Sequence, residues 1–363
     1  MTQFRLLKQT RQMTEYSCGA SALQSVLSYW GRDVAEEDLM RLIGTNAEVG
    51  TFPEDIVRGV RSLGLDAEAK EGLTLDDVRT FTAEGHPVIA LAQLWRSQKD
   101  TPASATDEWD CGHYIVVLAV DDDFVYFQDP YIRMGKGFMP RKTFEDHWHQ
   151  IMGGRELARS SELRHLAIFI RGGEPAQKPG GDEAQAVPDL SRLGSINLLN
   201  VRFPEHLLPF DFLDDLRSWL FDNEEILRPD AFVVIRKDAE GRVSAIQGGR
   251  LRDGQDTVEV NALIAAMAAQ AAAEGAEQVR SSVQAAVRAA SNGDFGLPAK
   301  YLRMLAERLP AGQSEIIIMF ENVWERRFQD VVRKHNGTVT NQRLMPTAAL
   351  DASMQRGRSP DSD

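Results

Sequence analysis

The stretch QMTEYSCGASALQSVLSYWG, residues 12–31, places Cys18 directly before a helical pattern. The apolar residues that follow have the i, i+3, i+4, i+7 spacing of one helix face: Leu23, Val26, Leu27 and Trp30. Gly31 is typical of a helix end. The pattern predicts a helix that begins near Cys18, whose sulfur then faces unpaired N–H groups and the positive end of the helix dipole. A thiol attacks carbonyls as the thiolate, so this position favours a nucleophile.

The composition is that of an ordinary globular protein. Its 363 residues are 43% hydrophobic and 26% charged, with a formal net charge of −13 at pH 7. A surface of this charge repels nucleic acids and anionic membranes, so we expect neither as a partner. Two cysteines are too few for a disulfide framework, and the most apolar stretch, residues 262–276, is too short and too polar to span a membrane. These features predict a cytoplasmic protein.

Two domains are predicted on either side of a linker. Residues 172–194 are rich in Gly, Pro and charge, which indicates a flexible linker. The first domain then covers residues 1–171 and the second residues 195–347. Residues 348–363 have the composition of a disordered tail.

In the first domain, helical patterns precede strand patterns. After the helix at Cys18, helices are predicted over residues 35–44, 53–64 and 73–85. Strands are predicted over residues 87–95, 113–120, 124–130 and 163–170. Helices followed by strands indicate the α+β class.

The second domain has the pattern of a small α+β sandwich. Helices are predicted over residues 207–225, 257–290, 298–310 and 323–337. Strands are predicted over residues 231–238, 242–249, 314–321 and 338–344. The Ala-rich helix at 257–290 presents small residues either to the core or to a second copy of the chain. The domain contains no cysteine and no His-carboxylate cluster, so the sequence does not predict its role.

A base for the cysteine stands at the start of a predicted strand. In CGHYIVVLAV, alternation places four residues on one face: His113, Ile115, Val117 and Ala119. Asp129 closes the following strand, so pairing about a turn at 121–123 brings Asp129 beside His113. A thiol nucleophile needs an imidazole base that is itself held by a third group.

Gln12 supplies a donor for the oxyanion. Its side-chain amide and the backbone N–H of Cys18 are suited to an oxyanion hole, in which one donor contributes ~3–4 kcal/mol to lowering the barrier. Taken alone, a residue in the position of Cys18, His113, Asp129 or Gln12 more often has a structural role than a catalytic one. Their order along the chain and their positions at element ends favour a catalytic set.

These motifs, Q-x5-CG-x-x-A, GHY-x-VV and a DP pair, resemble the papain-like cysteine peptidases of bacteria that process bacteriocin precursors after a double glycine. The resemblance covers about residues 9–170 and implies a papain-like fold and thiol peptidase activity on peptides. It implies Cys18 as nucleophile, His113 as base, Asp129 as orienting acid and Gln12 as oxyanion donor, with no metal and no organic cofactor.

The chain departs from that family in two respects. The family's best-known members are fused to a membrane ABC exporter, which these residues do not contain, and the loop at 96–112 is longer than usual. Because of these two departures, the resemblance does not predict the identity of the substrate. The second domain loosely resembles an uncharacterised bacterial domain family, which transfers no chemistry.

Several alternatives remain open at this stage. If the first domain is not a peptidase, it is a thiol-dependent acyltransferase or a catalytically silent peptide-binding module. Cys111 is either a free loop thiol or the partner of Cys18 in an inhibitory disulfide. The spacing of Cys18, Cys111 and His113 fits no zinc pattern. Gly172-Gly173 is either ordinary linker or a self-processing site.

Overall fold

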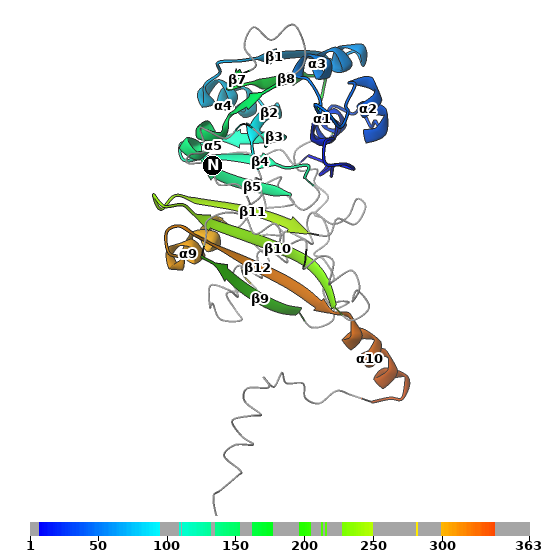
Figure 1. Cartoon of the computed structure of the whole chain (residues 1–363). Coiled ribbons are helices and arrows are strands. Elements are labelled where there is room, and N and C mark those ends of the chain that lie inside the picture. Colours follow the sequence, from blue (N-terminus) through cyan, green and yellow to red (C-terminus); the bar gives the residue numbers. More distant parts are fainter. Residues whose placement is uncertain are drawn as a thin grey trace, which may run out of the picture.

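In the computed structural model the chain is organised around one large antiparallel sheet (Figure 1). The structure describes residues 7–94, 109, 111–131, 135–152, 162–176, 196–204, 212, 215, 227–249, 281 and 299–337. Several predicted elements lie outside these residues: the helices at 207–225 and 257–290, the strand at 338–344, most of the loop at 96–112 and the tail.

Within the described residues the sheet has ten strands, in the order β1-β8-β2-β3-β4-β5-β11-β10-β12-β9. The first part of the chain supplies β1 (Asp66–Lys70), β2 (Val88–Gln93), β3 (Gly112–Val120), β4 (Phe124–Gln128), β5 (Lys136–Pro140) and β8 (Ala167–Arg171). The second part supplies β9 (Ile196–Phe203), β10 (Leu227–Lys237), β11 (Val243–Gly249) and β12 (Gln313–Asn322). A separate ribbon pairs β6 (His149–Ile151) with β7 (Glu162–Arg164).

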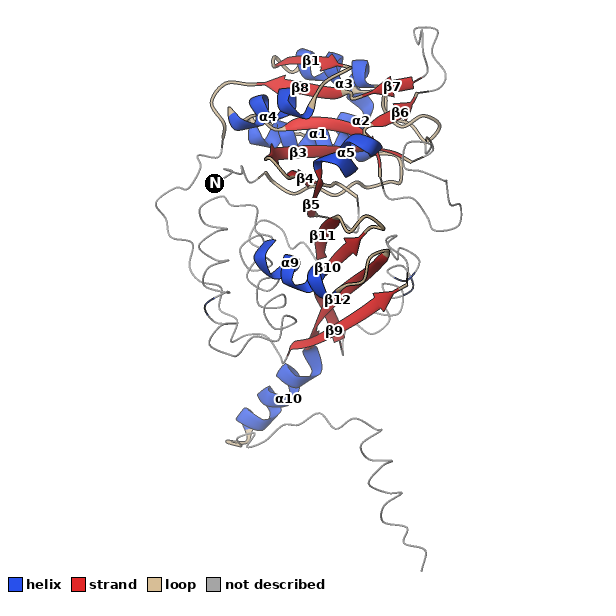
Figure 2. Ribbon diagram, turned by 90° about the vertical axis from the view of Figure 1, so that its left-hand side faces the viewer, coloured by secondary structure: helices blue, strands red, loops and turns tan. Residues whose placement is uncertain are grey.

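Helices cover both faces of this sheet (Figure 2). One core contains side chains of α1 (Cys18–Tyr29), α2 (Glu36–Leu42), α3 (Pro53–Ser62) and α9 (Ala299–Arg308). The opposite core contains side chains of α4 (Leu75–Ala83) and α5 (Arg141–His147). The remaining described helix, α10 (Val323–Lys334), follows β12. Helices packed on an antiparallel sheet confirm the predicted α+β class.

The first helix forms as its pattern predicts. The four apolar residues of its face are all buried: Leu23, Val26, Leu27 and Trp30. Gly31 follows with φ of +74°, a left-handed conformation that favours glycine after a helix. The predicted helix start at Cys18 is therefore confirmed.

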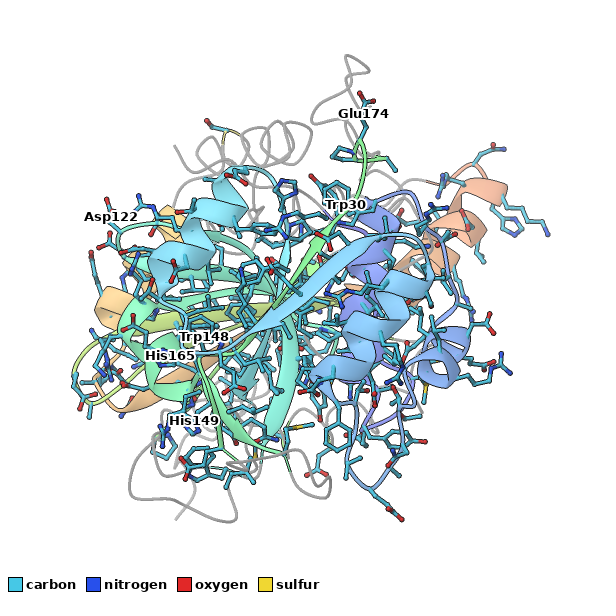
Figure 3. All side chains as sticks on the ribbon, turned by 90° about the horizontal axis from the view of Figure 1, so that it is seen from above. Trp30, Asp122, Trp148, His149, His165 and Glu174 are labelled. Carbon is cyan, nitrogen blue, oxygen red and sulfur yellow. The ribbon has the colours of Figure 1, made fainter. Side chains whose placement is uncertain are left out.

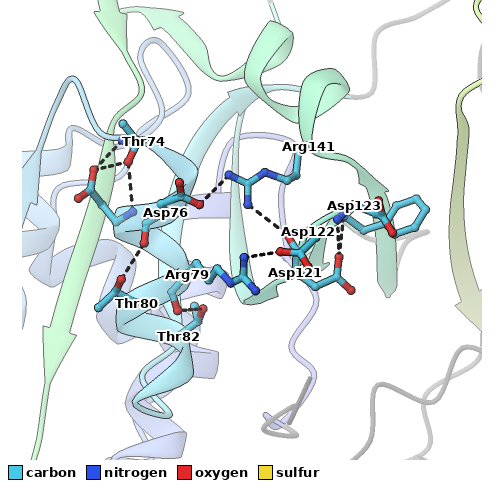
Figure 4. Close-up of polar contacts among 11 residues, drawn as sticks. Thr74, Asp76, Arg79, Thr80, Thr82, Asp121, Asp122, Asp123 and Arg141 are labelled. Carbon is cyan, nitrogen blue, oxygen red and sulfur yellow. Dashed lines mark hydrogen bonds and ion pairs between the residues drawn. The ribbon is translucent and has the colours of Figure 1, made fainter. Parts of the chain in front are cut away.

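The predicted hairpin of β3 and β4 is also confirmed. Its strands pair about the turn at 121–123, and Arg79 of α4 donates to Asp122 Oδ1 at 2.7 Å (Figure 4). Arg141 donates to the backbone oxygen of Asp121 at 3.1 Å and to Asp76 of α4 at 2.8 Å. These contacts tie the turn to the helices that flank it.

One detail of the strand prediction is wrong. Ile115 and Val117 share one core, but Ala119 lies in the opposite one with Tyr114 and Leu118. The register of β3 against β4 shifts between Val117 and Ala119, and such a bulge moves every later side chain to the other face.

The strand predicted over 163–170 is interrupted at His165. This residue has φ of +53°, and its ring stacks on Trp148 with centroids 5.0 Å apart (Figure 3). His165 Nδ1 also lies 2.9 Å from the carbonyl oxygen of Leu73. At His165, where the ring makes these tertiary contacts, the strand breaks, and the segment is divided into β7 and β8.

The two halves of the chain share the sheet through β5 and β11. Three residue pairs join these strands: Phe138–Ala245, Gly137–Ile246 and Lys136–Gln247. The predicted hairpin of β10 and β11, the strand β12 and the helices α9 and α10 are present, whereas β9 was not predicted. The domain boundaries remain predictions, and the sequence did not predict that the sheet would continue across them.

Candidate active site

Cys18 is the first residue of α1, with the buried residue Ser17 before it. Gly19, the next residue, permits a close approach of the helix to β3. A Cβ at Gly19 would lie 3.1 Å from Tyr114 Cδ2 and 3.2 Å from the side chain of Thr51. Tyr114 in turn donates its hydroxyl to the carbonyl oxygen of Thr51 at 2.9 Å, so the helix start is held against the sheet from two sides.

His113 and Asp129 form a buried pair. His113 Nε2 lies 2.8 Å from Asp129 Oδ1, and the Asp129 side chain is fully buried. The same carboxylate oxygen accepts the backbone N–H of Tyr131 at 2.7 Å. The Asp129 N–H donates to the carbonyl oxygen of Gly135 at 2.7 Å, which ties the residue to the start of β5. The predicted proximity of His113 and Asp129 is present in the structure.

The Cys18 side chain lies close enough to the His113 ring to raise the pKa of the imidazole. Burial alone lowers the pKa of His113, but the charge and hydrogen bond of Asp129, together with Cys18, outweigh it and raise the pKa from 6.5 to about 10. The imidazole is therefore held in its protonated form between a carboxylate and a thiol.

Tyr131 covers one side of this pair. Its ring stands edge-on to the imidazole of His113, with centroids 6.1 Å apart and an interplanar angle of 88°. Since the Tyr131 N–H also bonds Asp129, both the backbone and the side chain of Tyr131 contact the pair. The sequence pattern did not identify this residue, although it directly follows the Asp129-Pro130 motif.

Gln12 lies beside the strand end that carries Asp129. Its backbone N–H donates to the carbonyl oxygen of Pro130 at 2.7 Å, and its side chain is buried. Gln12 Nε2 donates to the carbonyl oxygen of Thr14 at 2.9 Å. This bond uses one of the two N–H groups of the amide and leaves the second for another acceptor.

The start of β3 is held by two glutamines that the sequence pattern did not identify. Gln93 accepts the backbone N–H of Cys111 at 2.8 Å, and its Nε2 donates to Gln150 Oε1. Gln150 packs over Gly112, where a Cβ would lie 1.8 Å from Gln150 Nε2. Gly112, the residue before His113, therefore leaves room for the Gln150 amide. In the sequence, this glycine is the feature that could have indicated the contact with Gln150.

Cys18 is a free cysteine. The pairing of β2 and β3 extends to Cys111, whose carbonyl oxygen accepts the N–H of Leu94 at 3.0 Å. A disulfide between Cys18 and Cys111 remains a prediction. Within the described residues, no group of three or more His, Cys, Asp or Glu side chains is arranged to hold a metal ion. None of the helices in that part of the chain combines the length and apolarity that a membrane crossing requires.

Comparisons with known proteins assign the family. The model of the "Peptidase C39 family" matches residues 7–153. An uncharacterized protein of Methanothermobacter marburgensis is 32% identical over 134 residues, which cover 37% of this chain and 78% of that protein. The chain belongs to the peptidase C39 family. The predicted resemblance to double-glycine peptidases and the assignment to the peptidases are thereby confirmed.

Two further comparisons are with a longer protein and with a solved structure. The pediocin PA-1 transport/processing ATP-binding protein PedD of Pediococcus acidilactici is 28% identical over 142 residues, 39% of this chain. This chain spans only 17% of the length of PedD. The structure of a double glycine motif protease from an AMS/PCAT transporter, in complex with the leader peptide, is 16% identical, covers 48% of this chain and 99% of its own, and has a TM-score of 0.33.

Proposed function

We propose that this C39 family member is a cysteine peptidase in which Cys18 is the nucleophile, His113 the acid–base, Asp129 the orienting acid and Gln12 an oxyanion donor. The observation that carries the proposal is the position of the His113 imidazole, which is hydrogen-bonded to Asp129 and lies close enough to the Cys18 side chain for that group to raise its pKa. A nucleophile, a base and an orienting group in this order are the arrangement that covalent catalysis of acyl transfer requires.

In the proposed mechanism the Cys18 thiolate attacks a peptide carbonyl and forms a tetrahedral oxyanion. The oxyanion accepts one hydrogen bond from the backbone N–H of Cys18. It accepts a second from the side-chain amide of Gln12, through the N–H that is not bonded to Thr14. Protonated His113 gives its proton to the leaving amine, which leaves a thioester on Cys18. His113 then takes a proton from water, the hydroxide attacks the thioester, and the acid product departs.

We propose peptides with small residues at the cut, such as Gly-Gly, as substrates. Support comes from the family and from PedD, which is named as a transport/processing protein. We also propose a cytoplasmic location, which the low number of cysteines supports because proteins of oxidising compartments are often rich in disulfides. In this proposal residues 1–171 form the peptidase domain and residues 195–347 a module that binds or localises.

The test is hydrolysis of Gly-Gly peptides by the full chain, with products identified by mass spectrometry. We expect a free acid ending in Gly-Gly, no product from Cys18→Ala or His113→Ala, and unchanged activity in the control Cys111→Ser. A product joined to an added amine would indicate an acyltransferase instead. Equal hydrolysis by wild type and Cys18→Ala would contradict the proposal.

A further inference from the structure

A buried carboxylate contacts the loop between Gln12 and Cys18. Glu36 is the first residue of α2, and only 5% of it is exposed. Glu36 Oε1 accepts the backbone N–H of Met13 at 2.9 Å. Burial raises the pKa of Glu36 from 4.5, against the hydrogen bond from Met13 and the nearby Ser17 side chain, which lower it. The fold thus keeps a carboxyl group where its charged form is costly.

The contact with Met13 fixes the backbone of Gln12. The Gln12 N–H is bonded to Pro130, and the next N–H along the chain, that of Met13, is bonded to Glu36. The peptide planes on both sides of the Gln12 Cα are therefore held, one by the strand end next to Asp129 and the other by Glu36. Together they determine the direction in which the Gln12 side chain leaves the backbone.

Hydrogen bonds of Ser17 hold the other end of the loop. Ser17 directly precedes Cys18 and is fully buried. Its Oγ accepts the Thr14 N–H at 3.0 Å and donates to the Thr14 carbonyl oxygen at 3.2 Å. Because the Gln12 amide donates to that same carbonyl, Gln12 and Ser17 are joined through Thr14, and Glu36 holds this loop at Met13.

We infer that Glu36 is a positioning residue for catalysis, whose carboxylate sets the spacing between the Gln12 amide and the Cys18 N–H by holding the backbone of the loop at Met13. The inference rests on the proposed function, in which those two groups are the oxyanion donors. Glu36 touches no substrate and acts only through the loop. Displacing a donor by a fraction of an ångström weakens its bond to the oxyanion more than its contact with the ground state.

The test compares Glu36→Gln, Glu36→Asp and Glu36→Leu, with Glu37→Leu as an exposed control on the same helix turn. Glutamine keeps an oxygen that accepts the Met13 N–H, so we expect kcat within about threefold of wild type. Leucine removes the hydrogen bond to the Met13 N–H, and we expect kcat to fall roughly ten- to a hundredfold, with KM changed less than about threefold. The side chain in Glu36→Asp is shorter by one methylene, so we expect its kcat to lie between those of Glu36→Gln and Glu36→Leu.

The inference is overturned if Glu36→Leu folds and retains the wild-type kcat, or if glutamine loses as much activity as leucine. A purely structural role would lower the unfolding free energy without changing the kcat of the folded fraction. Should the leucine variant fail to fold, a wild-type kcat in Glu36→Asp would overturn the inference in its place.

A second readout separates this inference from the proposed function. Hydrogen exchange of the Met13 amide, followed by NMR, needs no substrate. We expect slow exchange in wild type and Glu36→Gln and faster exchange in Glu36→Asp. If wild type hydrolyses no peptide but the Met13 amide behaves in this way, the proposed function fails while the loop contact stands. Rapid exchange in wild type would overturn the inference even if the peptidase were active.

Discussion

At the residue scale, the site depends on how Asp129 controls the charge of His113. The carboxylate is fully buried and makes its bond to the ring at 2.8 Å, in surroundings where water screens it little. The raised pKa of His113 keeps the imidazolium present at neutral pH, ready to stabilise a thiolate and to protonate a leaving amine. In the proposed mechanism, Asp129 therefore sets both the orientation and the protonation state of His113.

Replacing Asp129 by Asn tests this electrostatic role. The His113 pKa of about 10 places the alkaline limit of kcat/KM well above pH 8, and loss of the carboxylate should move that limit toward pH 6.5. We expect kcat itself to fall at least about tenfold, since an amide also favours the wrong tautomer. The measurement is kcat/KM from pH 5 to 10.5. An alkaline limit unchanged in Asp129→Asn would contradict the assignment.

The same pair affects stability with a defined sign. A group whose folded pKa is raised stabilises the fold fully below its unfolded value, here about 6.5, and the contribution is lost as pH rises through about 10. Urea unfolding of wild type should therefore show a decline in unfolding free energy across that range. The decline in unfolding free energy should be smaller in Asp129→Asn. Equal declines in the two proteins would show that groups other than His113 cause it.

At the element scale, the packing of α1 on β3 brings the cysteine to the histidine. The contact is close because Gly19 has no side chain, and Tyr114 and Thr51 occupy the space that a Cβ would need. The helix cannot approach β3 in this way with a larger residue at position 19. The small residues after Cys18 thus serve the geometry of the site as well as the uncrowded helix start.

Gly19→Ala tests this contact. The added methyl group would lie 3.1–3.2 Å from its neighbours, so the helix start must shift by a few tenths of an ångström. We expect a loss of about 1–3 kcal/mol in unfolding free energy and a lower kcat, because Cys18 moves with the helix. Gly173→Ala is the control, since nothing lies within 4 Å of a Cβ there. Wild-type kcat in Gly19→Ala would show that the contact does not position Cys18.

The sequence predicted the elements that have strong periodic patterns and missed those that depend on tertiary contacts. The helix face of Leu23 to Trp30 and the β3–β4 hairpin follow from local spacing and turn residues. The bulge before Ala119 and the break at His165 arise from packing that no local pattern encodes. Strand β1, with the sequence DAEAK, has residues that are depleted in strands, so only its pairing with β8 identifies it.

The same division applies to the candidate site. Cys18, His113, Asp129 and Gln12 were predicted because each stands at an element end in a recognisable motif. Tyr131, Gln93, Gln150 and Glu36 hold these groups from outside the motifs. Their roles follow from contacts between residues up to 57 positions apart, which local spacing does not reveal.

At the scale of the whole molecule, the second half of the chain extends the sheet of the first. Strand β11 pairs with β5, and Gly135, just before β5, accepts the N–H of Asp129. An unpaired β5 would expose a row of backbone groups at the edge of the peptidase sheet. The pairing therefore links the C-terminal strands to the segment that holds Asp129.

Gly137→Val tests this link. A Cβ at Gly137 would lie 2.7 Å from Phe127 Cζ and 3.0 Å from the carbonyl oxygen of Ala245 on β11, so valine should force the strands apart. We expect wild type to unfold in one calorimetric transition and Gly137→Val in two, with reduced kcat. Gly173→Ala should behave like wild type. A single unshifted transition in Gly137→Val would mean that the two halves are not coupled through this seam.

The central claim is that Cys18 and His113 act as one reactive pair, and the rate at which iodoacetamide alkylates Cys18 at pH 6 tests it most directly. The rate is measured by peptide mass spectrometry in Cys111→Ser, with and without His113→Ala. We predict rapid alkylation that slows at least about tenfold without the imidazole, because its charge stabilises the thiolate. Equal, slow rates in the two proteins would contradict the claim.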